Sequence, residues 1–253
     1  MTNDTVEAFR DSARDFLSRA DTITRLRALR SSAEGFDRQA WQSIANAGWP
    51  AVLVSEQDGG LGLGLREMSA IAEEVGQHLL PEPYIASAVQ ATVALARSPQ
   101  SALRALLLEQ LCTGELIAGL AWQEQLGQLR CEHIETTAQK SGDGYKLNGT
   151  KCFVLPGPGA DGWLVLAVEG TTPILAWLPQ DTAGVGCSEQ RCVDGSVMYT
   201  LVLKDVMVAT SHVLATGPMV TIAVNEANDF ARIIQSAELL GVMRRALAVT
   251  LEY

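Results

Sequence analysis

The sequence predicts an α+β protein with an N-terminal helical domain, a central antiparallel β-barrel or sandwich, and the start of a C-terminal helical bundle. Apolar residues recur at helical spacing until about Gly114. Short β-branched or alternating segments then follow one another to about Pro218. From about Asn228 the helical period returns. We therefore divide the chain into residues 1–114, 115–220 and 221–253.

Helices account for most of the first part. Val6, Phe9, Ala13 and Phe16 recur at helical spacing and mark the first one. Further helices are expected near Asp37–Ala47, Leu65–Gln77 and Ser101–Thr113. Pro81 and Pro83 break the chain between helices.

The sequence pattern of the second part predicts β-strands. Its segments include GELIAGLAW, GWLVLAV, TPILAWL and MYTLVLKDVMV. Between two further strands, Ser141–Gly144 (SGDG) predicts a hairpin turn, because glycine tolerates the positive φ that such turns need. Several short strands joined by tight turns indicate an antiparallel sandwich or barrel.

The last helix carries an apolar stripe from Phe230 to Leu251 and is still in its pattern at Tyr253, without a capping signal. Because such a stripe needs partners to cover it, we expect a C-terminal helical domain to continue beyond Tyr253. The alternative is a short protein whose last helix docks on the first domain.

Composition limits the function. The chain has 253 residues, 47% of them hydrophobic, and a net charge of −10, which argues against a nucleic-acid partner. No apolar stretch approaches the ~20 residues of a membrane span. The charged N-terminus MTNDTVEAFRDSARDFL has no apolar signal core, so a cytoplasmic location is expected.

The cysteines and histidines predict neither a disulfide framework nor a metal site. Five cysteines in apolar, strand-like settings favour buried free thiols, although Cys187 and Cys192 could pair. The three histidines, His78, His133 and His212, have no zinc-like spacing to cysteine.

The loop SEQDGGLGLG (Ser55–Gly64) has the glycine content of a phosphate-binding loop. In the dinucleotide fingerprint, however, the third glycine would come one position later than Gly64. Glu56 and Asp58 would also repel a phosphate. We interpret the loop as a turn whose leucines pack beside the start of a helix.

Three motifs, in order along the chain, carry a family resemblance. GWPAVLVSEQDGGLGLG, followed by a helix with Glu73 and Glu74, resembles the N-terminal domain of acyl-CoA dehydrogenases. GDGYKLNGTKCFV (Gly142–Val154) is similar to the strand pair around that family's flavin-facing Trp-Ile-Thr segment. LVLKDVMVATSHVL (Leu201–Leu214) resembles the family's F-x-D-V-x-V-P region. LLPEPYIAS (Leu79–Ser87) looks like bacterial members that handle steroid or other bulky acyl-CoA thioesters.

The resemblance implies FAD held between the β domain and a C-terminal four-helix bundle. It implies α,β-dehydrogenation of an acyl-CoA, in which a glutamate removes the α-proton and a hydride passes to flavin N5. It also implies a homo- or hetero-oligomer, dimer or tetramer, and an electron-transferring flavoprotein as electron acceptor. No nucleic-acid or membrane partner is expected.

Carried over position by position, the resemblance assigns flavin contacts to Trp122, Gln123, Glu124, Phe153, Val154 and Leu155. It assigns substrate contacts to Leu129, Asp229 and Arg232, although the last two could form an ordinary i,i+3 surface ion pair.

Several of these positions depart from the family pattern. The flavin-binding threonine is Gln123, the serine near pyrophosphate or substrate is Leu129, and the threonine that reaches flavin N5 is Leu155. The catalytic base is expected beyond Tyr253. At the alternative family position the residue is Ala231, which cannot accept a proton.

These departures lead to a hypothesis and its alternatives. The chain is interpreted as the flavin-poor subunit of a heteromeric acyl-CoA dehydrogenase. A homo-oligomeric enzyme with unusual flavin contacts is one alternative. A catalytically silent acyl-CoA-binding or scaffold subunit with the same fold is the other.

Overall fold

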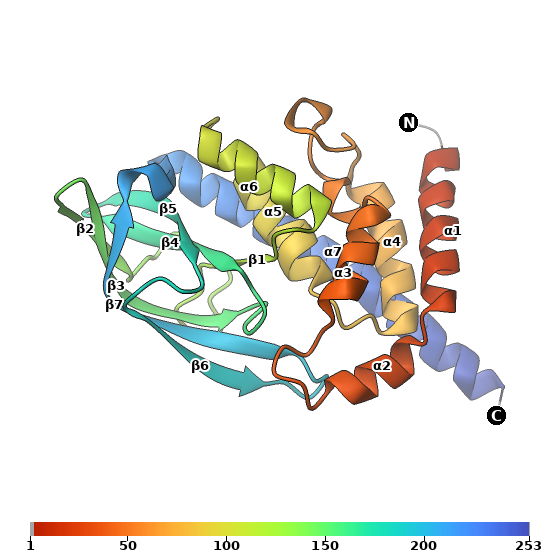
Figure 1. Ribbon diagram of the computed structural model, residues 1–253. Coiled ribbons are helices and arrows are strands. Elements are labelled where there is room, and N and C mark those ends of the chain that lie inside the picture. Colours follow the sequence, from red (N-terminus) through yellow and green to blue (C-terminus); the bar gives the residue numbers. More distant parts are fainter. Residues whose placement is uncertain (1–2, 253) are drawn as a thin grey trace.

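A computed structural model describes residues 3–252 of the chain. Met1, Thr2 and Tyr253, which belong to the first and last predicted domains, lie outside the described residues. The first part is helical and is arranged as a layer beside the sheet (Figure 1). Its elements are α1 (Asn3–Arg19), α2 (Thr22–Leu29), α3 (Arg38–Asn46), η1 (Trp49–Ala51), η2 (Glu56–Asp58), α4 (Leu65–His78), the π-helix η3 (Tyr84–Ala91), α5 (Thr92–Ala96) and α6 (Ala102–Thr113).

Local capping explains where these helices begin and end. The Asp37 carboxylate accepts a hydrogen bond from the Gln39 backbone N–H at 2.8 Å and starts α3. Ser101 caps α6 in the same way, accepting from the Arg104 N–H at 3.1 Å, and Gly114 ends that helix with φ 78°. Helix α2 was not predicted. Thr22 is its only buried residue, so the sequence has no apolar stripe that would indicate a helix.

The second part forms one sheet of β1 (Ala118–Ala121), β2 (Thr137–Ser141), β3 (Gly144–Val154), β4 (Gly162–Glu169), β5 (Thr172–Pro179), β6 (Val185–Arg191), β7 (Val197–Ala209) and β8 (Val213–Thr216). Within the described residues, the strand order is β6-β7-β3-β2-β4-β5-β8, with β1 paired to β4. Most pairs are antiparallel as predicted, and the turn between Ser141 and Gly144 joins β2 to β3. The β1–β4 and β2–β4 pairs are parallel, which the turn pattern did not predict.

Strand β4 lies at the centre and is buried on both faces. Trp163, Val165 and Ala167 belong to the core inside the curved sheet, whereas Leu164 and Leu166 pack against the helices. The edge strand β6 was missed because its residues are largely exposed and lack apolar alternation; pairing with β7 holds it in place.

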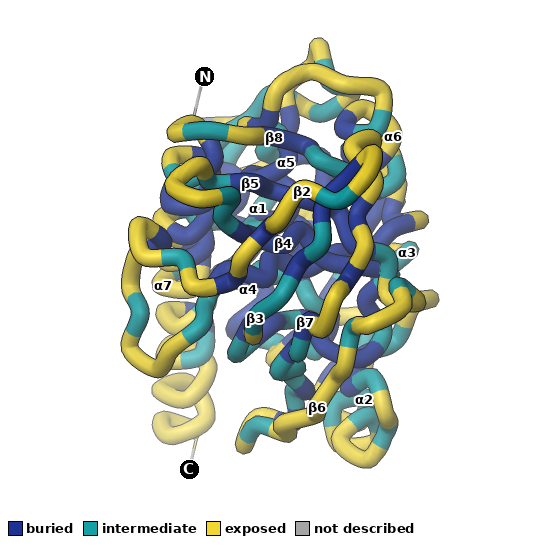
Figure 2. The backbone as a smooth tube through the Cα atoms, turned by 90° about the vertical axis from the view of Figure 1, so that its left-hand side faces the viewer, coloured by how far each residue is buried: buried dark blue, intermediate teal, exposed yellow. Residues whose placement is uncertain are grey.

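The long helix α7 (Pro218–Leu251) begins well before Asn228, where the sequence predicted it. The β-branched run Val220-Thr221-Ile222 conceals the helical period. The helix nevertheless buries Val220, Val224 and Ala227 in the core that it shares with α5, α6 and the sheet. It runs from the sheet across the helical layer to the C-terminus, where its exposed last turns project (Figures 1 and 2).

Helices α4 and α7 cross at very short range, at one glycine of each. A Cβ on Gly76 would collide with the Glu238 carbonyl oxygen, and a Cβ on Gly241 with the Glu73 carbonyl oxygen. Because only glycine fits at both positions, α7 is fixed against the first part of the chain in a single register.

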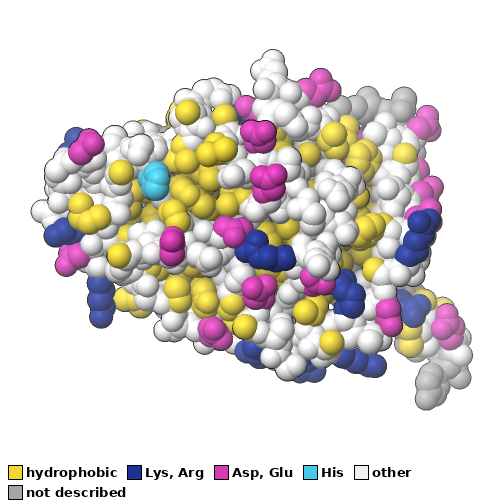
Figure 3. Space-filling view, in the orientation of Figure 1, with side chains coloured by type: hydrophobic (Ala, Val, Ile, Leu, Met, Phe, Trp, Pro, Cys, Tyr) yellow, Lys and Arg dark blue, Asp and Glu magenta, His cyan; other side chains and the backbone are white. Residues whose placement is uncertain are grey.

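The five thiols are free. Cys131 is buried, but Cys187 is exposed on the edge strand β6, so the prediction that the cysteines are buried is wrong for Cys187. Charges of both signs mix on the face shown in Figure 3, without a continuous basic surface. Among residues 3–252, no helix combines the length and the apolarity that crossing a bilayer would require.

Candidate functional site

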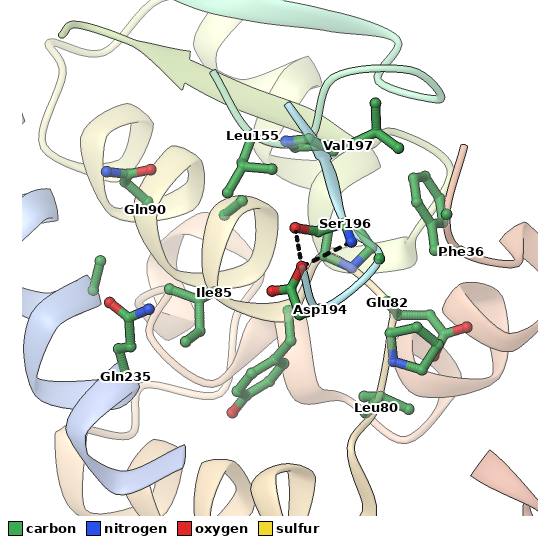
Figure 4. A pocket seen from close by; sticks show the side chains of 18 of the residues that line it. Phe36, Leu80, Glu82, Ile85, Gln90, Leu155, Asp194, Ser196, Val197 and Gln235 are labelled. Carbon is green, nitrogen blue, oxygen red and sulfur yellow. Dashed lines mark hydrogen bonds between the residues drawn. The ribbon is translucent and has the colours of Figure 1, made fainter. Parts of the chain in front are cut away.

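A cavity of about 490 Å³ lies where the helical layer, the sheet and α7 meet. Its walls come from segments that are far apart in the sequence: Leu26, Glu34–Phe36, Leu79–Gln90, Leu120–Gln123, Cys152–Pro156, Asp194–Val197 and the α7 residues Ala231, Gln235 and Glu238. Figure 4 shows these segments converging on one space. The lining is mostly apolar, with a few amides and carboxylates, as is usual for a small-molecule site.

One end of the cavity is bounded by Trp122, Gln123, Phe153 and Leu155, which we call the sheet wall. The register between β3 and β7 shifts between Lys151 and Val154, and this irregularity turns the chain at Phe153. Phe153 has φ 56°, a left-handed conformation that is rare for an aromatic residue. Such strain is typical of a side chain that is held at a functional site.

A buried ion pair lies behind the sheet wall. Lys151 Nζ is 2.7 Å from Glu124 Oε1, and both side chains are almost fully buried. The Glu124 carboxylate also accepts the backbone N–H groups of Glu135 at 2.6 Å and Thr136 at 2.7 Å. Burial lowers the pKa of Lys151 to about 8, against the opposing effect of Glu124. The pair joins Glu124 to β3 beside the sheet wall.

Four of the six predicted flavin contacts therefore line the cavity, and they are the four residues of the sheet wall. The other two side chains lie elsewhere. Glu124 is engaged by Lys151, and Val154 is buried in the core of the sheet.

The part of the cavity beside Glu238 and Asp194 is acidic, and we call it the acidic end. Glu238 comes from α7, seven positions after Ala231, and Asp194 comes from the tip between β6 and β7. Burial, together with the smaller effect of the Asp194 charge, raises the pKa of the Glu238 carboxyl to about 6. Asp194 Oδ1 accepts from the Ser196 backbone N–H at 2.9 Å and from Ser196 Oγ at 2.8 Å (Figure 4). Sequence reasoning missed both carboxylates.

Ala231 of α7 also lines the cavity. The alternative family position for the base thus faces the cavity, but it carries a methyl group. The position of Glu238 two helical turns further on the same face could have been read from the sequence.

The predicted substrate contacts lie outside this cavity. Asp229 and Arg232 form an exposed i,i+3 ion pair at 2.7 Å. Arg232 Nη2 also donates to the Leu129 carbonyl oxygen, so the structure brings all three residues together. The side chain of Leu129 is exposed, and Arg130 adds a second contact to Asp229 at 3.5 Å.

The glycine-rich loop uses its own backbone donors. The N–H groups of Leu61, Gly62 and Leu63 bond to the carbonyl oxygens of Ala51, Val54 and Val52. A Cβ on Gly60 would collide with Val54. The Asp58 carboxylate is bound by the buried Arg104 at 2.8 and 2.9 Å, which holds its pKa well below the usual range. The loop is therefore structural, as predicted, and offers no phosphate site.

In the described part of the chain, no group of three or more His, Cys, Asp or Glu residues is placed to hold a metal ion.

Comparison with known proteins gives a consistent result. Residues 3–115 match the N-terminal domain of acyl-CoA dehydrogenases. The acyl-CoA dehydrogenase FadE27 of Mycobacterium tuberculosis is 27% identical over 250 residues, covering 96% of this chain and 65% of the relative. Mitochondrial isovaleryl-CoA dehydrogenase of Bos taurus is 26% identical over 228 residues, covering 85% of this chain and 54% of the relative. The chain thus spans less than two thirds of the length of these relatives.

Solved structures share the fold over the whole chain. A variant of the steroid ACAD Tcur3481-Tcur3483 is 30% identical with a TM-score of 0.84, covering 98% of this chain and 66% of that one. The ChsE4-ChsE5 complex from Mycobacterium tuberculosis is 25% identical with a TM-score of 0.87, covering 100% and 67%. The FAD complex of PigA is 25% identical with a TM-score of 0.85, covering 100% and 68%. From its helical layer, its sheet and these matches, we conclude that the chain belongs to the acyl-CoA dehydrogenase superfamily.

Proposed function

We propose that this chain forms the flavin- and substrate-binding part of an FAD-dependent acyl-CoA dehydrogenase. The observation that carries the proposal is the cavity between the sheet wall and α7, which joins an aromatic surface to an apolar channel. A flat ring and an acyl chain need such surfaces side by side, and the cavity lies within a fold shared with acyl-CoA dehydrogenases.

The sheet wall fits a flavin ring by its shape and polarity. Trp122, Phe153 and Leu155 would hold the ring by stacking and apolar contact, and Gln123 would lie at its edge. The wall offers no hydroxyl where the family has threonine, so hydrogen bonds to the ring would come from backbone amides. When bound, the flavin supplies the acceptor for a hydride.

The residues of this chain bind and orient the acyl group rather than deprotonate it. The apolar lining excludes water, which strengthens any hydrogen bond to the thioester carbonyl. Asp229 and Arg232 would contact the CoA end, and Leu129 lies beside Arg232. Because Ala231 has no acidic group, the base would come from another part of the protein or from another chain.

We further propose that the chain works in a heteromeric assembly. The steroid ACAD Tcur3481-Tcur3483 and the ChsE4-ChsE5 complex, two of its structural neighbours, are named as pairs of different chains. Because this chain lacks the base and the hydroxyls at Gln123 and Leu155, it would hold the flavin only together with a partner chain, which would make it the flavin-poor subunit. Electrons would pass to an electron-transferring flavoprotein, in the cytoplasm.

The test is to purify the complete protein together with a related chain encoded beside its gene. We expect a yellow complex that contains fewer FAD molecules than subunits and oxidises an acyl-CoA. One FAD per chain in a pure homo-oligomer would remove the heteromeric proposal. A colourless complex that takes up no added FAD would overturn the dehydrogenase proposal and favour the alternative of a catalytically silent scaffold subunit.

A pair of variants ties the flavin to the sheet wall. We expect Phe153→Ala to weaken FAD binding about tenfold, because loss of an aromatic contact costs on the order of 1 kcal/mol. Val193→Ala, an exposed apolar truncation outside the cavity, is the matched control and should leave FAD binding unchanged.

A further inference from the structure

We propose that the acidic end of the cavity selects acyl groups whose far end carries a hydrogen-bond donor, with Glu238 and Asp194 as the acceptors. This inference rests on the proposed function, since it assumes that the cavity holds an acyl group. It narrows the substrate class to acyl thioesters with a distal hydroxyl or ammonium group.

The order of residues along α7 gives the direction of the acyl group. Asp229 and Arg232 lie where the CoA end is proposed, Ala231 faces the cavity beside them, and Glu238 follows two turns later. Seven residues of helix span about 10 Å, roughly the length of a medium acyl chain. Leu155 of the sheet wall, Asp194 and Gln235 of α7 border the same space in Figure 4, and the charge of Asp194 acts on Glu238. Glu238 therefore lies where the far end of the acyl group would reach.

The Glu238 carboxylate has acceptor capacity to spare. Among the described residues, no donor makes a hydrogen bond or ion pair with its side chain, although it is half-buried. Asp194 uses Oδ1 for Ser196, and its Oδ2 makes no hydrogen bond within residues 3–252. A half-buried carboxylate without donors is unfavourable, and a ligand that supplies a donor relieves this.

The surrounding charges do not neutralise Glu238. No Lys, Arg or His is among the residues that line the cavity. On the neighbouring elements, Arg25 binds Glu82, and Arg10 and Arg244 bind Glu73. The side chain of Arg30 lies close to Gly195 but is exposed to solvent. Tyr84, which faces Glu238 from η3, donates its hydroxyl to Met68.

The same arrangement excludes one class of ligand. A distal carboxylate would meet Glu238 and Asp194 without any cation between them. Like charges brought together at a binding site disfavour the complex. Dicarboxylic acyl groups should therefore be rejected.

The experiment uses the complete protein with its partner chains and a matched set of CoA thioesters. The set has one medium chain length and ends in methyl, hydroxyl, ammonium or carboxylate. Dissociation constants are measured by titration calorimetry. We expect the hydroxyl or ammonium thioester to bind about tenfold more tightly than the methyl one, and the carboxylate thioester to bind least tightly. Preference for ammonium over hydroxyl, or the reverse, identifies the donor.

Variants separate the role of Glu238 from general effects. We expect Glu238→Met, which removes both acceptors, to abolish the preference for donors. Glu238→Gln should abolish the preference for ammonium and keep part of that for hydroxyl. Glu226→Met, on the same helix but paired with Arg97 outside the cavity, should leave all preferences unchanged.

The outcomes distinguish the two proposals. If no thioester binds, both the proposed function and this inference are wrong. If all four bind equally, or if Glu238→Met keeps the preference for donors, only the inference is overturned.

Discussion

Lys151 and Glu124 illustrate how a single charged pair supports the cavity from behind. Lys151 is fully buried, and its only ion-pair partner among the described residues is Glu124. Removing one partner leaves the other charge buried and unpaired, which is more costly than removing both. The pair is therefore a structural support for β3 rather than a contact to substrate.

We predict that Glu124→Gln lowers the free energy of unfolding by about 3 kcal/mol and that adding Lys151→Met restores part of the loss. Urea denaturation measures both. Lys146→Met, which removes an outer ion pair with Asp205, is the control and should cost less than about 1 kcal/mol. A double variant as unstable as the sum of both single changes would contradict this.

Glu238 should give stability a specific pH dependence. Its pKa is about 6 in the folded chain against 4.5 when unperturbed, so between these values the folded state binds more protons than the unfolded one. The protonated form of Glu238 therefore stabilises the folded state. This contribution to the free energy of unfolding is complete below pH 4.5 and is lost as the pH rises through 6.

We predict that Glu238→Gln is as stable as the original chain below pH 4.5 and more stable above pH 6, by about 1 kcal/mol for a partly hydrated group. Denaturation of both proteins across this range gives the difference. A difference that does not change with pH would show that Glu238 is not perturbed.

The residues of the cavity show what the sequence could predict at this scale. The resemblance named Trp122 and Phe153, and both line the cavity. Each lies in or directly after a short continuous strand segment that can be recognised in the sequence. Asp194 could not be found, since it reaches the cavity only through the pairing of β6 with β7. Glu238 could have been found by continuing from Ala231 along the same helix face, but the apolar stripe alone does not indicate which polar neighbour faces a cavity.

At the scale of elements, the crossing of α4 and α7 fixes one wall of the cavity. Gly76 and Gly241 allow the two backbones to touch, and Glu238 lies three residues before Gly241. A side chain at either glycine would push the helices apart.

We predict that Gly76→Ala lowers the free energy of unfolding by about 2 kcal/mol, the usual effect of overpacking, and weakens acyl-CoA binding by shifting Glu238. Denaturation and calorimetry measure the two effects. Gly186→Ala, on β6 with only ordinary contacts around its Cβ, is the control and should leave both nearly unchanged.

Elements with a strong period were predicted closely, whereas weak or β-branched ones were not. The expected helix Leu65–Gln77 corresponds to α4, and Ser101–Thr113 corresponds to α6. Helix α2 and strand β6 bury little and give no periodic signal. Their positions depend on tertiary contacts, such as Arg191 donating to the carbonyl oxygens of Arg30 and Ser32.

On the scale of the whole molecule, the order of helical layer, sheet and long helix was confirmed, because each part has its own composition. The division at residues 114 and 220 stays a prediction. So does the expectation of a further domain beyond Tyr253. The cavity could not be predicted, since its walls come from seven separate segments.

The second half of α7 exposes an apolar surface formed by Leu239, Leu240, Met243, Leu247 and Leu251. Each such side chain stabilises by about 1.5–3 kcal/mol when it is buried. We predict that the 253-residue chain on its own self-associates at micromolar concentration, and that Leu240→Glu with Leu247→Glu reduces this. Sedimentation velocity measures it, with Arg245→Glu as a control on the same helix. A clean monomer before any substitution would contradict the prediction.

The tip between β6 and β7 has a consequence for how new specificities could arise. It is a short hairpin on a sheet edge, with Val193 outside and Asp194 at the cavity, and it is distant in sequence from the sheet wall. Under the proposed function, grafting hairpins of different length or charge at this place would vary the range of accepted thioesters while the residues of the sheet wall stay unchanged. The fold thus separates what a protein engineer would vary from what must be kept.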